Sequence, residues 1–125
     1  MIEEKFKVLQ FIRELIQRVD KELMNYPKRE IEIKLRIRNS MFNLLELCYE
    51  ANTAASITRK EELLERSIAK IKVIDFLLNL SYEKSLITSK KYLKLAEKLN
   101  DIVKYISGWL KKVKQDKNKI QKIKI

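Results

Sequence analysis

Glycine and proline are almost missing from this chain, which has one of each in 125 residues. An average sequence of that length would hold about fifteen of them. Sandwiches and barrels of β-strands need many tight turns, and tight turns favour these two residues. An all-β fold is therefore excluded, and a few long helices are expected.

Histidine is absent, and cysteine occurs once, at Cys48. Catalysis by Ser-His-Asp or Cys-His groups is excluded, as are zinc and di-iron sites that use histidine. A single cysteine forms neither an internal disulfide nor a cysteine-rich metal site. One glycine is too few for a P-loop or a dinucleotide-binding turn. We therefore predict that the protein is not an enzyme and uses no cofactor and no metal.

Long apolar runs are also lacking, since no stretch approaches the ~20 residues of a membrane span. The first five residues do not have the apolar core of a signal peptide. We expect a soluble, cytoplasmic protein with no membrane partner. The remaining alternative is binding to a membrane surface by the C-terminal residues, where lysines are interleaved with valine and isoleucine.

Positive charge is in excess, with 28 Lys and Arg against 17 Asp and Glu, a net charge of +11. The surplus is clustered, because residues 88–110 carry +3 and residues 111–125 carry +6. Such a field attracts polyanions. The alternative is that the extra lysines only keep the protein soluble.

Apolar residues recur at helical spacing in four segments, at about residues 2–24, 30–54, 58–80 and from 88 or 89 onward. Thr58, with a glutamate three residues later, resembles a capping box at the start of the third helix. Long helices with short connections predict an all-α, antiparallel up-down-up-down four-helix bundle. We assign residues 1–112 to the bundle. Residues 113–125 form a basic tail, either a helix extension or disordered.

The second helix has two apolar seams where a lone bundle needs one. One seam passes through Ile37 and Leu44, and the other through Leu35, Phe42 and Tyr49. Two seams indicate a helix that packs on both sides, with a second subunit on one of them. A broad stripe buried within one subunit is the alternative.

The candidate binding residues are basic, because phosphate contacts need only cations within reach and carry no sequence information. Signatures of RNA-recognition motifs, KH domains and zinc fingers are absent. The candidates are Lys34, Arg36, Arg38, Arg59, Arg66, Lys70, Lys90, Lys94, Lys98, Lys111, Lys112, Lys114, Lys117 and Lys119.

Three short motifs carry a family resemblance: Tyr26-Pro27-Lys28, Glu50-Ala51-Asn52 and above all Ser107-Gly108-Trp109-Leu110-Lys111. Together with the helix order and the basic end, they resemble the accessory variability determinant (Avd) family of diversity-generating retroelements. The resemblance covers nearly the whole chain, and its Gly-Trp-Leu-Lys ending is the most specific part.

The resemblance implies a four-helix bundle that assembles into a homopentameric ring with a positive surface. It implies a non-catalytic protein that binds the element's reverse transcriptase, RNA and DNA. It further implies a role in mutagenic copying of a template RNA into cDNA and in retrohoming. Carried onto this chain, Gly108 and Trp109 are packing residues, and Leu35, Phe42 and Tyr49 fit an interface between subunits.

Two departures from the family pattern leave an alternative. Ser107 stands beside Gly108, where a second small residue, commonly glycine, is usual. A glycine that is frequent early in the second helix is replaced by Ile33-Lys34-Leu35. These differences leave open a related family, the four-helix proteins encoded in intervening sequences of 23S ribosomal RNA genes, with a structural or interaction role.

Overall fold

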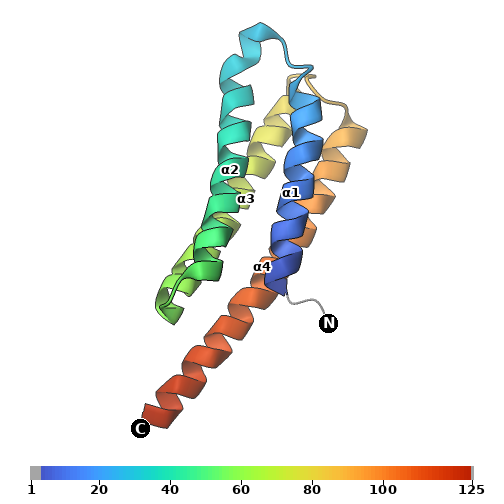
Figure 1. The fold of residues 1–125 in the computed structure, drawn as a ribbon. Helices are drawn as coiled ribbons and strands as arrows, with labels where there is room; N and C mark the ends of the chain where they lie inside the picture. The colour runs from blue at the N-terminus through green and yellow to red at the C-terminus, as the bar shows by residue number, and fades with distance from the viewer. Residues whose placement is uncertain (1–3, 125) are drawn as a thin grey trace.

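A computed structural model describes residues 4–124 of the chain (Figure 1). Four long helices and one short 3₁₀ turn make up the described structure. They are α1 (Glu4–Leu23), η1 (Lys28–Glu30), α2 (Ile31–Thr53), α3 (Ile57–Glu83) and α4 (Ser89–Lys124). The predicted all-α class is confirmed, and the first three helices end within a few residues of the expected positions, whereas α4 continues as a helix to Lys124.

The helices form an antiparallel up-down-up-down bundle, as predicted (Figure 1). Each helix packs against two others, in the cyclic order α1, α2, α3, α4 and back to α1. Within residues 4–124, the backbones of α1 and α3 are not adjacent, nor are those of α2 and α4. Short connections between antiparallel neighbours give this arrangement.

One apolar core runs along the bundle axis, built from the helical stripes that the spacing predicts. Its fully buried side chains include Ile12 of α1, Leu44 of α2, Ile74 of α3 and Ile102 of α4. The single tryptophan, Trp109, belongs to the same core and is only 6 % exposed. Gly108 lies beside it inside α4, half-buried and without a positive φ angle.

The start of α3 corrects one local prediction. Ser56, not Thr58, is the N-cap, and its side chain accepts a hydrogen bond from the Arg59 N–H at 3.2 Å. Thr58 lies inside the helix. Either hydroxyl satisfies a free N–H group at a helix start, so the N-cap at the earlier serine adds two residues, Ile57 and Thr58, to α3.

The end of α3 lies three residues beyond the predicted one and uses an unusual residue. Ser85 takes a positive φ of 62°, a conformation that normally favours glycine. The Leu86 N–H then donates to the Ser81 carbonyl at 2.8 Å, which satisfies one free carbonyl of the last turn. Because serine replaces the usual glycine, the sequence gives no clear stop signal there.

Helix α4 continues well past the other helices (Figure 1). It has 36 residues against 20 in α1, which corresponds to about 54 Å against about 30 Å. Two ion pairs tie this extension to the first turns of α3. Lys117 Nζ lies 3.1 Å from a carboxylate oxygen of Glu61, and Lys114 Nζ lies 3.9 Å from one of Glu65.

Candidate nucleic-acid interface

The groove between α1 and α4 gathers basic side chains from both helices. It encloses a hollow of about 400 Å³, lined by Arg18 and Lys21 of α1 and by Lys94 and Lys98 of α4. Lys94 and Lys98 are one helical turn apart, so they point to the same side of α4. We call these four residues the cationic groove.

Charge in the cationic groove is largely uncompensated. Lys91, on its border, forms an ion pair of 3.1 Å with Glu22. Among the described residues, none of the four groove cations takes part in an ion pair. Side chains of like charge that converge without counter-ions attract a polyanion strongly, because each phosphate contact releases bound cations from it.

The three basic candidates on α2 do not form one site. Arg36 pairs with Glu32 at 3.6 Å, one turn away on the same helix. Arg38 reaches Asp20 of α1, with its Nη2 atom donating to a carboxylate oxygen at 2.7 Å. Lys34 is half-buried, and no ion pair is described for it.

The candidates on α3 line a second hollow of about 400 Å³, between α2 and α3. Arg66 and Lys70 face it together with Glu46 and Glu50. Arg59, at the same hollow, is within 3.9 Å of Glu50 and 3.4 Å of Glu62. Carboxylates offset much of the positive charge here, so this site attracts a polyanion less than the cationic groove does.

The C-terminal candidates divide into two sets. Lys114 and Lys117 hold the extension against α3, whereas Lys111, Lys112 and Lys119 are exposed and have no ion pair in the described part of the chain. Lys90 is likewise exposed at the start of α4.

Arg18 and Lys21 were missed by sequence reasoning. Residues 1–26 carry no net charge, so the average over that segment hides them. The signal that could have found them is their spacing of three, which places both on one flank of α1.

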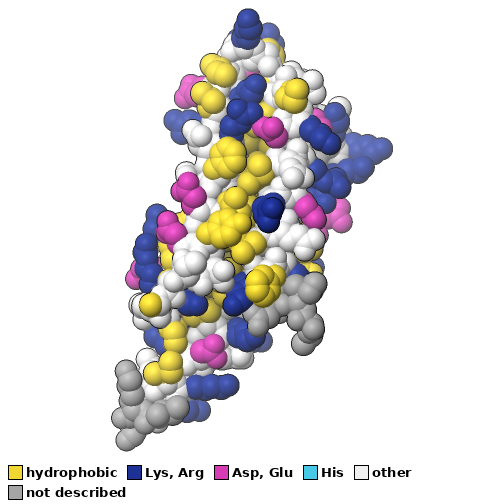
Figure 2. Space-filling view, viewed as in Figure 1, with side chains coloured by type: hydrophobic (Ala, Val, Ile, Leu, Met, Phe, Trp, Pro, Cys, Tyr) yellow, Lys and Arg dark blue, Asp and Glu magenta, His cyan; other side chains and the backbone are white. Residues whose placement is uncertain are grey.

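The groove between α1 and α2 has the opposite character. Leu35, Phe42 and Tyr49 of α2 are 43–45 % exposed, and Phe6 of α1 is 54 % exposed. Figure 2 shows hydrophobic side chains in a line down this side of the molecule. The second seam of α2 is therefore not buried within one chain. We call these four residues and Leu9 the apolar face.

Two shallow hollows interrupt the apolar face. One, of about 350 Å³, is lined by Phe6, Leu9 and Tyr49 among others. The other, of about 270 Å³, has Phe42 and the Arg38–Asp20 pair at its edge. Contiguous apolar surface rimmed by polar groups is typical of a protein–protein contact.

Cys48, the single cysteine, is buried in the core. Burial raises the pKa of the Cys48 thiol to about 11, although a hydrogen bond with Ser67 acts in the other direction. Within the described residues there is no cluster of three metal-ligating side chains. Nor does any helix described between residues 4 and 124 have the length and apolarity to cross a membrane.

A family model described as bAvd-like matches residues 1–113, a range that includes α1, α2, α3 and α4 as far as Val113. The comparisons with curated proteins and with solved structures give no match.

Proposed function

The chain belongs to the bAvd-like family, and from this premise we propose that it is a non-catalytic, nucleic-acid-binding accessory protein of a reverse transcriptase. In this role it assembles in the cytoplasm with a retroelement's reverse transcriptase and template RNA. It supports mutagenic cDNA synthesis and retrohoming. The family match favours this role over that of a 23S rRNA intervening-sequence protein.

The cationic groove is the observation that carries the proposal. Its four cations come from two helices and form no ion pair among the described residues, and Glu22, the carboxylate in its lining, pairs with Lys91. The groove lacks aromatic side chains, so it suits the sugar–phosphate backbone and not the bases. Contacts of that kind are indifferent to sequence, and we propose that the groove accepts RNA and also DNA.

Homo-oligomerisation, as a pentameric ring, is the second part of the proposal. The apolar face would be covered in such an assembly, because contiguous exposed apolar surface is unfavourable in water. A different apolar surface is exposed on α3, where Val73 and Phe76 are 47 % and 64 % exposed. Two unlike surfaces on different helices suit head-to-tail contacts, which close into a ring when the rotation allows.

The test is RNA binding across a salt titration. The variant Arg18→Gln/Lys21→Gln/Lys94→Gln/Lys98→Gln removes the charge of the groove. We expect its affinity to fall by at least about tenfold, and the slope of log K against log salt to shrink by about three for single-stranded RNA. The mass of each species is measured alongside by light scattering.

A matched control removes the same charge elsewhere. Lys28, Arg29, Lys72 and Lys104 are exposed and have no ion pair among the described residues. Their replacement by Gln should leave most of the affinity. Equal losses in the two variants would mean that net charge alone drives binding, which would refute a defined groove.

A further inference from the structure

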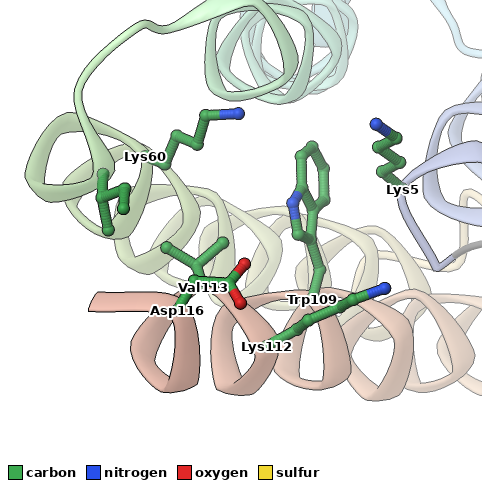
Figure 3. Close-up of a pocket in the computed structure, with 7 residues that line it drawn as sticks. Lys5, Lys60, Trp109, Lys112, Val113 and Asp116 are labelled. Atoms are coloured by element: carbon green, nitrogen blue, oxygen red, sulfur yellow. The ribbon is translucent and has the colours of Figure 1, made fainter. Parts of the chain in front are cut away.

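A further hollow, of about 270 Å³, lies where α4 leaves the bundle (Figure 3). Trp109, Lys112 and Asp116 of α4 line it, with Lys60 from the first turns of α3 and Lys5 from the start of α1. Figure 3 shows the indole of Trp109 standing out from α4 between Lys60 and Lys5. We call this hollow the tryptophan pocket.

The residues of α4 that line the pocket lie on one side of the helix. Residues 109, 112 and 116 are spaced three and four apart, which places them on that side. Further back on α4, Tyr105 contacts Phe11 of α1, with ring centroids 5.3 Å apart. The indole of Trp109 borders the hollow, while most of its surface is packed in the core.

The charged groups around the pocket are of both signs. Lys60 and Lys112 take part in no ion pair described for residues 4–124, and neither does the Asp116 carboxylate. A bare phosphate ion would be drawn by the lysines but repelled by Asp116. The lining suits a ligand with an anionic group, a flat apolar body and hydrogen-bond donors for a carboxylate.

A nucleotide combines these three properties. We propose that the tryptophan pocket binds one unpaired nucleotide of the RNA strand, an inference that rests on the proposed function. Lys60 and Lys112 contact its phosphate, the base meets the indole edge, and Asp116 accepts hydrogen bonds from amino or hydroxyl groups. The hollow, of about 270 Å³, is smaller than pockets that enclose drug-sized ligands, so part of the nucleotide stays outside it.

The pocket and the cationic groove lie along the same helix. Lys98 and Trp109 are eleven residues apart, which corresponds to about 16 Å along α4. A strand whose backbone lies in the groove can thus place a nucleotide in the pocket two or three positions further on. The groove supplies the charge contacts, and the pocket supplies the aromatic contact that the groove lacks.

The chain has a single tryptophan, so its fluorescence reports on the pocket directly. The full-length protein is titrated with AMP, and in parallel with adenosine and with inorganic phosphate. We expect a saturable change in emission with AMP at millimolar concentration or below, and a response at least about tenfold weaker to the other two. No saturable response to AMP, or equal responses to AMP and phosphate, would overturn the proposal.

Variants separate this site from the groove. Lys60→Gln/Lys112→Gln should weaken the AMP response by about tenfold, since charge-assisted contacts are lost. Lys72→Gln/Lys104→Gln, equal in charge, should leave it unchanged, as should the quadruple groove variant. An AMP response that is insensitive to Lys60 and Lys112 would refute the pocket. RNA binding without an AMP response refutes the pocket alone, whereas an AMP response without RNA binding refutes the proposed function.

Discussion

Helix α1 borders two grooves of opposite character. Toward α4 it contributes Arg18 and Lys21 to the cationic groove. Toward α2 it contributes Phe6 and Leu9 to the apolar face, where Tyr49 completes the hollow. The two sides of this one helix thus differ in charge, although residues 1–26 are neutral in total.

Because one groove is apolar and the other is cationic, the two contribute to binding in different ways. Apolar surface gains free energy by leaving water, about 25 cal/mol per Å², and it does so without needing an oppositely charged partner. Lysine and arginine side chains stay solvated and attract phosphate over a distance that salt shortens. Assembly should therefore depend on the apolar face, and nucleic-acid affinity on the cationic groove.

The largest effect is expected on assembly. Phe42→Glu/Tyr49→Glu places two carboxylates on the apolar face, and burying them unpaired is too costly for an interface to tolerate. Light scattering should show the change from an assembly of about five subunits to a monomer, with helicity preserved because both side chains are exposed. Met24→Glu, at a 74 % exposed residue outside the face, is the control. An unchanged mass for the double variant would remove the apolar face as the interface.

The next effect concerns the two halves of the cationic groove. Two double variants each remove one half, Arg18→Gln/Lys21→Gln and Lys94→Gln/Lys98→Gln. Each should lower RNA affinity by about tenfold, and the two should reduce the salt slope by the same amount as each other. The masses should not change. A loss confined to the α4 pair would mean that RNA follows α4 alone and that α1 takes no part.

The existence of the groove and of the face was only partly predictable from the sequence. The helical spacing on α2 predicts a seam through Leu35, Phe42 and Tyr49, and the structure leaves this seam exposed. The alternative of a broad buried stripe failed because α1 and α3 already fill the core side of α2. Lysines on α4 were predicted as candidates, but their α1 partners depend on packing between helices far apart in sequence.

Local features near the helix ends were harder to predict. Ser56 and Thr58 are both good N-caps, and the sequence does not rank them. Ser85 takes the position where a glycine would have marked the end of α3. Ion pairs such as Lys117–Glu61 could not be predicted either, because they require the register of α4 against α3.

A smaller effect should appear at alkaline pH, in the core that separates the two grooves. The pKa of Cys48 is raised by burial to about 11, above its ordinary value of 9.0. The folded state thus holds its proton after the unfolded state has lost it. The contribution of the protonated thiol to stability is complete below pH 9 and is lost between pH 9 and 11, by roughly 1 kcal/mol at pH 10.

Comparison with the variant Cys48→Ala isolates the contribution of the Cys48 thiol to this pH dependence. Urea unfolding at pH 8 and pH 10 should show a smaller drop in the free energy of unfolding for the variant, by roughly 1 kcal/mol. Equal drops in both proteins would mean that the thiol ionises in the folded state as readily as in the unfolded chain. The core near Ser67 would then be open to water.

The smallest effect is expected for the ion pair at the edge of the apolar face. The Arg38–Asp20 pair has good geometry, at 2.7 Å, but its side chains are 38 % and 52 % exposed. Solvent screening limits such a pair, so Asp20→Asn should cost less than about 1 kcal/mol in the monomeric Phe42→Glu/Tyr49→Glu background, measured by urea unfolding. In the assembled protein a neighbouring subunit would exclude water from the pair, and removing one partner would then cost several kcal/mol. Equal small losses in both backgrounds would place Arg38 and Asp20 outside the interface and confine the contact to the aromatic residues.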